Sequence, residues 1–289
     1  KAYDAYTNYM YDYNAALTMT FSGPANSPNG TAPLYPSAAG DITFLGGTTN
    51  AETMTLYMAE TVDVTVALSS DSTVKGVLAS QKVVPAGVNY YTVTAPATAI
   101  AHAPFSVTVT PYDAFANVTV GATVTLVAHK PNGAIGAPDG VLTGSTSLDT
   151  SAGPASTNVI YGRVDTIDVH AYDGGGHVSN DNLTQDTSFS PNVPAEIVIT
   201  PLATEYPAGS TIPVFATVTD AIGAAGNLVA DGTMVTWTFT GPAENAGFEN
   251  PVQFTIETAT VAGIATVEFR PDTVAYQSYT IKASWNSVS

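Results

Sequence analysis

Few residues in this chain have side chains suited to catalysis. It holds no cysteine and only four histidines, so thiolate metal sites, thiol nucleophiles and disulfides are excluded. None of the histidines lies in a zinc-binding or nucleophile motif, and the sequence has no G-x-S-x-G elbow, phosphate-binding loop or H-E-x-x-H helix. We therefore expect no enzymatic activity and no organic cofactor. The four histidines are His102, His129, His170 and His177.

One loop has the oxygen ligands that calcium prefers. Asp173 is followed by three glycines and then by Asn180, Asp181 and Asn182. Carboxylate and amide oxygens on a flexible turn suit calcium, although the spacing is not that of an EF-hand. A cluster of Gly, Asn and Asp is also an ordinary turn signal. Calcium at these four residues is thus one reading of the loop, and a plain turn is the other.

Three N-x-Ser/Thr sequons mark candidate glycosylation sites. They begin at Asn29, Asn117 and Asn182, each in a segment expected to be a loop. Sequons in surface loops are compatible with a glycosylated surface protein. The chain is rich in threonine, so chance sequons are also expected.

The N-terminal segment alternates over an unusual length. From Tyr9 to Phe21 the odd positions are aromatic or apolar and most even positions are polar, the period of a β-strand. Fully extended, the stretch would span roughly 40 Å. It is read either as the first strand of its own sheet or as an arm that adds as a strand to a neighbouring subunit. The arm residues expected at such a subunit interface are Tyr3, Tyr6, Tyr9, Tyr11, Tyr13 and Leu17.

The charge balance restricts the partners. The formal net charge is −17, with seven Lys plus Arg, so neither nucleic acid nor an anionic membrane surface is an expected partner. Charged residues make up 11% and hydrophobic residues 45%, which indicates a folded chain with a neutral polar surface. No apolar run is long enough to span a membrane as a helix. We expect an exported protein, with Lys1 as a processed N-terminus.

Strand signals dominate the rest of the chain. Period-two runs rich in Val, Thr, Tyr and Ile recur between Gly, Pro, Asn and Asp clusters, the pattern of β-sandwiches. The predicted fold class is all-β, with tandem immunoglobulin-like sandwiches of about 100 residues each. Pro-rich breaks near residues 94–99 and 189–194 set the predicted limits. They give an extended N-terminal arm at 1–16, a first sandwich at 17–97, a second immunoglobulin-like domain at 98–190 and a third at 191–289.

The last two domains share a sequence pattern. A strand leads into Asp113-Ala114-Phe115-Ala116-Asn117 in one and into Asp220-Ala221-Ile222-Gly223 in the other. We expect the Asp side chain to cap each turn. The chain later continues with Gly263-Ile264-Ala265-Thr266-Val267 and Tyr279-Thr280-Ile281-Lys282-Ala283. These motifs resemble bacterial immunoglobulin-like repeats of the invasin and intimin type, most clearly over residues 195–285.

The resemblance and the leader together suggest a structural role. The leading hypothesis is a subunit of an extracellular filament or surface layer, a homopolymer assembled by strand addition of the N-terminal arm. The alternative is an adhesin stalk, or a module that contacts a carbohydrate or a receptor. A third possibility is the accessory β-region of a secreted hydrolase.

Overall fold

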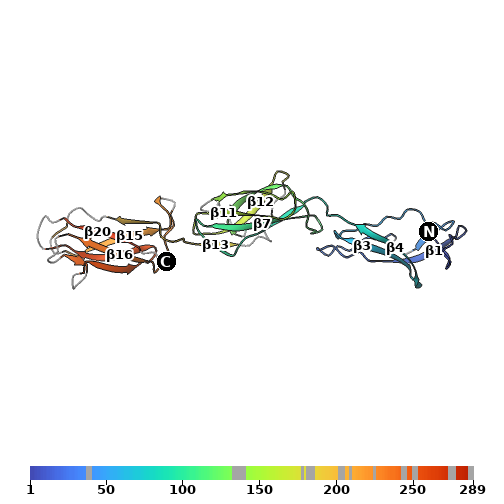
Figure 1. Ribbon diagram of the computed structural model, residues 1–289, viewed down its shortest axis with the longest axis horizontal. Coiled ribbons are helices and arrows are strands. Elements are labelled where there is room, and N and C mark those ends of the chain that lie inside the picture. Colours follow the sequence, from blue (N-terminus) through green and yellow to red (C-terminus); the bar gives the residue numbers. More distant parts are fainter. Residues whose placement is uncertain are drawn as a thin grey trace.

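A computed structural model describes residues 1–36, 41–131, 141–176, 179, 186–200, 206–207, 210–223, 226–241, 246–248, 253–272 and 278–285. The described part of the chain is all-β, as predicted. Three bodies lie in a row, with the N-terminus in the body at one end (Figure 1).

The strands group by pairing into three units. The first unit contains β1 (Ala15–Ser22), β2 (Asp41–Phe44), β3 (Thr61–Leu68) and β4 (Asp71–Lys82). The second contains β5 (Tyr90–Thr94), β6 (Thr98–Ile100), β7 (Pro104–Tyr112), β8 (Thr123–His129), β9 (Leu142–Gly144), β10 (Ser147–Asp149), β11 (Ala155–Tyr161), β12 (Thr166–Asp173) and β13 (Thr187–Ser190). The third contains β14 (Glu196–Thr200), β15 (Ile212–Thr219), β16 (Met234–Thr240), β17 (Gly247–Phe248), β18 (Thr255–Ala259), β19 (Ile264–Arg270) and β20 (Thr280–Ser284).

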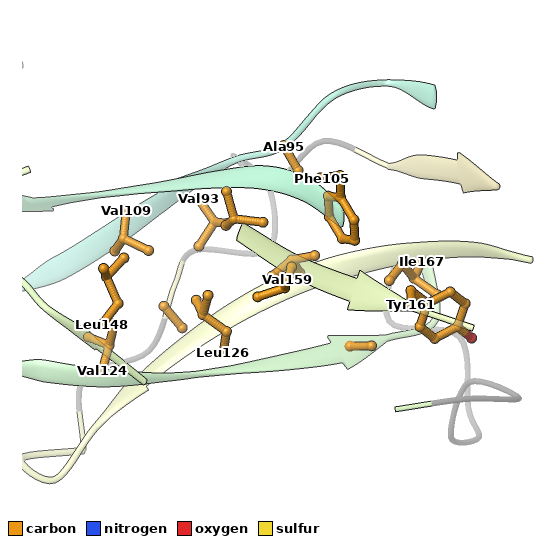
Figure 2. Close-up of a cluster of buried hydrophobic side chains, with 14 of the residues drawn as sticks. Val93, Ala95, Phe105, Val109, Val124, Leu126, Leu148, Val159, Tyr161 and Ile167 are labelled. Carbon is orange, nitrogen blue, oxygen red and sulfur yellow. The ribbon is translucent and has the colours of Figure 1, made fainter. Parts of the chain in front are cut away.

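The second unit is a sandwich of two sheets. One sheet has the order β5-β7-β11-β9 and the other β10-β8-β12-β13-β6. Alternate residues of both sheets meet in one core, which includes Val109, Val159 and Leu126 (Figure 2). Phe189 of β13 packs against Phe105 and Tyr161 at one end of this core. The alternation read from the sequence is therefore the alternation between core and solvent.

The third unit repeats this topology. Its sheets have the orders β14-β15-β19-β17 and β18-β16-β20, which correspond strand for strand to β5-β7-β11-β9 and β10-β8-β12. Trp237 is fully buried at its centre and donates a hydrogen bond from Nε1 to Thr258 Oγ1 at 2.8 Å. In both units the first sheet has the A-B-E-D order of immunoglobulin domains and the second contains C and F. The immunoglobulin-like fold follows from this pairing.

The strand pairing departs from the expected break at 94–99. β5, assigned from sequence to the first sandwich, pairs with β7 from Tyr90↔Tyr112 to Thr94↔Thr108. The small residues and Pro96 then carry the chain across to the other sheet, where β6 runs parallel to β13. Proline has no N–H for a ladder, so it marks a crossover inside the sandwich here. The pairing changes between Lys82 and Tyr90 and again between Ser190 and Glu196; the exact domain limits stay a prediction.

The first unit differs from the predicted sandwich. Its described strands form one sheet, β2-β1-β3-β4. The described part of the segment between β1 and β3 contributes only β2 and isolated bridges such as Leu34↔Thr55. Four prolines at 24, 28, 33 and 36 remove ladder donors from this segment. Phe21 of β1 instead stacks on Tyr35 of the segment, with ring centroids 5.2 Å apart.

The leader, residues 1–14, corrects the prediction of an extended arm. β1 begins only at Ala15, and Tyr3 bridges back to Tyr9 as a hairpin. Asp4 causes the reversal, because its Oδ1 accepts hydrogen bonds from the amides of Tyr6 and Asn8. The alternation of residues 9–13 is therefore not used in one continuous strand.

The leader also packs against its own chain. The Ala2 amide donates to Gly47 O, and the Gly47 amide donates to Tyr13 O. Gly47 has φ +74°, and a Cβ there would lie 2.1 Å from Met10 O. This close approach requires glycine.

Replacing Gly47 by alanine is expected to detach the leader, because the added Cβ collides with backbone. Faster hydrogen exchange at the backbone amides of residues 2 and 47 than in the original chain would report the detachment. Gly30→Ala is the matched control: Gly30 also has positive φ, +89°, but its Cβ would meet nothing within 4 Å. Equal exchange in the two variants would contradict a docked leader.

Candidate functional site at the junctions between units

Two networks of side-chain hydrogen bonds lie where one unit meets the next. Two turns carry them, one after β7 and one after β15, and each begins with an aspartate. Asp113 Oδ1 accepts from the amides of Phe115 and Asn117 at 2.8 and 2.9 Å. Asp220 Oδ1 accepts from the Asn227 amide at 2.7 Å. The prediction that aspartate caps these turns is thus confirmed.

In the first junction, Asn117 connects the turn to the first unit. Its Nδ2 donates to Tyr57 O at 2.8 Å, and its Oδ1 accepts from the Ala59 amide at 2.9 Å. The same Nδ2 donates to Asp113 Oδ2 at 2.9 Å, which fixes the amide plane. Asp113 Oδ2 also accepts from the Ala86 amide in the linker. One asparagine and one aspartate therefore hold the preceding unit and the linker together.

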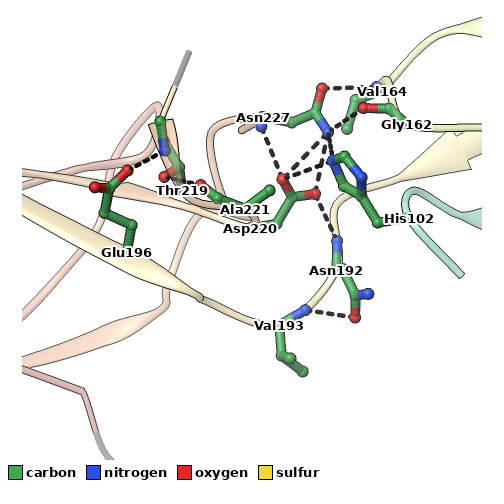
Figure 3. A network of polar contacts seen from close by, with 11 residues as sticks. His102, Gly162, Val164, Asn192, Val193, Glu196, Thr219, Asp220, Ala221 and Asn227 are labelled. Carbon is green, nitrogen blue, oxygen red and sulfur yellow. Dashed lines mark hydrogen bonds and ion pairs between the residues drawn. The ribbon is translucent and has the colours of Figure 1, made fainter. Parts of the chain in front are cut away.

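In the second junction, Asn227 makes the same contacts with the second unit (Figure 3). Its Nδ2 donates to Gly162 O at 3.2 Å, and its Oδ1 accepts from the Val164 amide at 3.0 Å. Its Nδ2 also lies 3.1 Å from Asp220 Oδ2. Asp220 Oδ2 accepts from the Asn192 amide in the linker at 3.0 Å.

The two networks are equivalent bond by bond. In each, the asparagine binds a carbonyl and the amide two residues later in the segment that leads into β3 or β12. In each, the aspartate takes a linker amide a few residues before the A-type strand, β5 or β14. We call each Asp–Asn pair, Asp113–Asn117 and Asp220–Asn227, a junction clamp.

Each clamp has its own additional contacts. Phe115 packs against Tyr57 of the first unit, with ring centroids 4.6 Å apart. In the second clamp His102 takes part: its Nε2 lies 3.7 Å from Asp220 Oδ1. The His102 ring packs over Gly162, where a Cβ would lie 3.0 Å from it. The first junction is thus closed by an aromatic pair and the second by a histidine.

The clamp carboxylates are shielded from solvent. Asp113 is 1% exposed and Asp220 5%. Burial by itself would raise the pKa of Asp113. Hydrogen bonds from the Asn117 side chain and from the amides of Ala86, Asn117 and Phe115 outweigh it and lower the pKa below its ordinary value of 3.8. Such bonds favour the ionised carboxylate.

The predicted glycosylation sites fall in different surroundings. Asn117 is 5% exposed, and the Nδ2 that would carry a sugar donates to Tyr57 and Asp113, so a glycan on Asn117 is not compatible with this structure. The physical reason is its place in the clamp. Asn29 is exposed, with Nδ2 3.2 Å from Ala114 O across the first junction. Asn182 lies outside the described residues.

Of the predicted calcium ligands, only Asp173 is described. Its Oδ2 accepts from the Tyr91 hydroxyl at 3.0 Å, and its Oδ1 accepts from the Gly175 amide at 2.9 Å. Asn180, Asp181 and Asn182 lie outside the described residues, so calcium stays a prediction. Within the described ranges, no three His, Asp or Glu side chains gather as metal ligands would, and no helix is long and apolar enough to cross a membrane.

Some tyrosines of the leader contact other residues of this chain, and others are exposed to solvent. Tyr13 packs edge-on against Phe44, and Tyr9 donates its hydroxyl to Gly46 O at 2.6 Å. Tyr3 packs edge-on against Tyr9. Tyr6 and Tyr11 are 84% and 78% exposed. Leu17, the other predicted interface residue, is half-buried in β1 opposite Ile42. Their role at a subunit interface stays a prediction.

The sequence reading missed that the two turns act between units. It singled out Asp113 and Asp220 as local caps and did not connect Asn227 with Asn117. The spacing hides the equivalence, because the asparagine follows its aspartate by four residues in one clamp and by seven in the other. The usable signal is an Asp after the B-type strand followed by an Asn before the C-type strand.

Comparisons with known proteins reveal distant structural likenesses. No family model and no curated protein matches this chain. An Escherichia coli adhesin, FdeC, is 15% identical over 98% of this chain and 85% of its own, with a TM-score of 0.44. Domains 4–9 of the surface layer protein SbsC are 15% identical over 97% of this chain and 39% of theirs, with a TM-score of 0.28. The FN1–FN3 domains of chicken CNTN1 are 10% identical over 94% and 85%, with a TM-score of 0.33. At these scores the fold assignment rests on the strand pairing above.

Acid is expected to loosen the first junction. Because the folded state lowers the pKa of Asp113, its stabilising contribution is present above the ordinary pKa and is lost as the pH falls through the lowered one. NMR spectra of the amides of Ala59 and Ala86, titrated from about pH 5 to pH 2, should shift before the sandwiches unfold. Amides that change only with global unfolding would contradict this role.

Proposed function

We propose that this chain is a structural rod of an extracellular surface assembly, a filament, a surface layer or an adhesin stalk, in which the junction clamps keep the units in line. The observation that supports this most directly is the repetition of one hydrogen-bond network at both junctions. A single contact between units could be incidental. The same carbonyl, amide and linker contacts made twice by different sequences point to a constraint on geometry.

The linkers support a rod with ordered joints. Each linker has one amide held by the clamp aspartate, Ala86 in the first and Asn192 in the second. A linker with a fixed amide cannot swing as a flexible tether does. The clamp therefore restrains the linker and the preceding unit with the same side chains.

The energetics favour an all-or-none joint. A net hydrogen bond contributes about 0.5–1.5 kcal/mol, while a buried polar group left without its partner costs about 1–3 kcal/mol. The clamp carboxylates are buried. Breaking the contact therefore exposes several hydrogen-bonding groups to water, or leaves them buried without a partner, all at once. A partly open joint is unfavourable, which keeps the row straight.

The composition supports an extracellular location. The chain has 11% charged residues, no cysteine and a net charge of −17. Its surface must therefore be covered largely by neutral polar side chains such as threonine, which favours an extracellular protein over a cytosolic one. Contact with a glycan or receptor belongs to the adhesin-stalk form of this proposal.

Assembly by strand addition is a second candidate, because β20 stands at an edge of its sheet among the described strands. In the second sandwich β12 has β13 on one side and β8 on the other. Its counterpart β20 pairs with β16 on one side only, as far as the described strands go. Such an edge accepts an added strand. The leader would have to leave its hairpin to supply one.

A disulfide between Tyr3→Cys and Tyr9→Cys tests strand addition, since it locks the hairpin in a chain that has no other cysteine. If the leader donates a strand, the oxidised variant fails to assemble and reduction restores assembly, as seen by electron microscopy. Assembly that is equal in both states would exclude this candidate.

Replacing the clamp asparagines is expected to bend the rod without unfolding the sandwiches. Asn117→Ala and Asn227→Ala each remove two contacts to the preceding unit. Small-angle X-ray scattering should show a broader distance distribution and a shorter mean length, most in the double variant. Each sandwich should still melt cooperatively, with its free energy of unfolding lowered by about 1–3 kcal/mol because the substitution leaves buried clamp groups without a partner.

Asn158→Ala is the matched control for these variants. Asn158 is an exposed asparagine on β11 away from both junctions. The rod proposal is wrong if the clamp variants scatter like this control.

A further inference from the structure

An asparagine of the first unit contacts the turn of the first clamp from outside. Asn29 lies in the turn Ser27-Pro28-Asn29-Gly30-Thr31, and its Nδ2 donates to Ala114 O at 3.2 Å. Its backbone amide donates to Phe115 O at 3.4 Å. Both acceptors belong to the second unit. Asn29 is exposed to solvent, so this part of the first joint is open to water.

The residue after Asn29 is a glycine. The side-chain amide of an asparagine reacts with the backbone nitrogen of the next residue, and a side chain on that next residue hinders the approach. Gly30 has no side chain, and a Cβ at its position would meet nothing within 4 Å. Asn29-Gly30 is the only Asn-Gly pair within the described ranges. Asparagine is also among the thermolabile residues of proteins, so this pair is a place where the chain can change chemically.

Three donors surround the side-chain carbonyl oxygen of Asn29. Oδ1 accepts from Ser27 Oγ at 2.7 Å, from Thr31 Oγ1 at 2.8 Å and from the Thr31 amide at 3.2 Å. Donors placed in this way stabilise the negative charge that develops on a carbonyl oxygen when a nucleophile adds to its carbon. Ser27 is buried, which restricts its hydroxyl. Cγ of Asn29 is therefore activated toward the Gly30 nitrogen.

We propose that Asn29 is a self-modification site, at which the side-chain amide is lost through a cyclic imide and the first joint is opened irreversibly. Hydroxide removes the Gly30 amide proton, and the nitrogen forms a bond to Asn29 Cγ. The Cγ–Nδ2 bond breaks, and Nδ2 leaves as ammonia with a proton from water. A water molecule then opens the imide at either carbonyl, which leaves aspartate or isoaspartate. The inference goes beyond the proposed rod and rests on its first joint.

The closed joint holds this reaction back. The Gly30 amide, which must lose its proton, donates to Ser27 O at 2.8 Å. The leaving group Nδ2 is bound to Ala114 O, and the Asn29 amide is bound to Phe115 O. An asparagine held at its backbone and at its leaving group cannot turn Cγ toward the next nitrogen. The conversion therefore follows the population of molecules in which the first joint is open.

The product cannot close the joint again in the same way. A carboxylate at position 29 has no N–H to donate to Ala114 O, and it places a negative charge in front of that carbonyl. The Asp113 carboxylate lies in the same turn and adds repulsion between like charges. Isoaspartate also inserts the side-chain methylene into the backbone, which displaces Gly30 from Ser27 O. Opening and modification thus reinforce each other, and the stiffness of the first joint declines with the age of the molecule.

The first test follows the modification by mass spectrometry of peptides from the full chain, incubated in warm, mildly alkaline buffer. We expect aspartate and isoaspartate to accumulate at Asn29. Asn117→Ala should speed the conversion about tenfold, because it opens the first joint. Asn227→Ala opens only the second joint and is the matched control, so it should leave the rate unchanged.

Two outcomes of this experiment would overturn the inference. If Asn29 stays an asparagine even in the Asn117→Ala variant, or carries a glycan in the purified chain, it is not a self-modification site. Equal rates in Asn117→Ala and Asn227→Ala would show that the reaction does not depend on the joint.

A further variant tests the donors around Oδ1. Thr31→Val removes the hydroxyl that lies 2.8 Å from Oδ1 and keeps the size of the side chain. Combined with Asn117→Ala, in which the joint is already open, it should slow the conversion about tenfold, because the charge that develops on Oδ1 loses a donor. An equal or faster rate would contradict the activation of Cγ.

The second test introduces one of the products directly. Asn29→Asp should broaden the distance distribution in small-angle X-ray scattering, as Asn117→Ala does. Asn158→Asp adds the same charge at an exposed position of β11 and should scatter like the original chain. If Asn29→Asp also scatters like the original chain while Asn117→Ala bends the rod, the modification does not open the joint, and the proposed rod stands. If Asn117→Ala does not bend the rod either, the proposed function itself is wrong.

Discussion

The structure depends on one interaction: an asparagine side chain that binds the backbone of the preceding unit while an aspartate holds it in place. The amide of Asn117 or Asn227 supplies one acceptor and one donor, which match a carbonyl and an N–H two residues apart. This is the pairing that a neighbouring strand would offer, made by a side chain. The aspartate orients the amide and binds the linker, so the joint needs no large apolar surface.

Joining the units by hydrogen bonds, without a large apolar surface, has a physical consequence for a chain of sandwiches. The second and third units each have a separate hydrophobic core, and each core is stabilised by burial that does not depend on its neighbour. The orientation between units must therefore come from groups at their ends. Directional hydrogen bonds set an angle, whereas apolar contact alone permits sliding. The buried Asp113 carboxylate, whose pKa is lowered by its hydrogen bonds, adds sensitivity to acid, because protonation weakens the bonds that it accepts from the amides.

Much of the fold was predictable because the signals are local. Alternation in Phe105–Thr110 and Ile212–Thr219 reflects one core face and one solvent face, and both became strands. β4 has no such signal, because its residues are exposed on both faces and do not alternate between apolar and polar. The leader was misread for the opposite reason. Its alternation is genuine, but the Asp4 carboxylate stabilises a turn that outweighs the strand preference of the tyrosines.

The junctions could not be read from the sequence in the same way, because each clamp joins residues more than fifty positions apart. The most direct test of the account places spin labels on Ser106→Cys in β7 and Glu268→Cys in β19, one in each sandwich, and measures the distance by pulsed electron paramagnetic resonance. Clamped units predict a single narrow distance distribution that broadens when Asn227 is replaced by alanine. A broad distribution in the unaltered chain would contradict it.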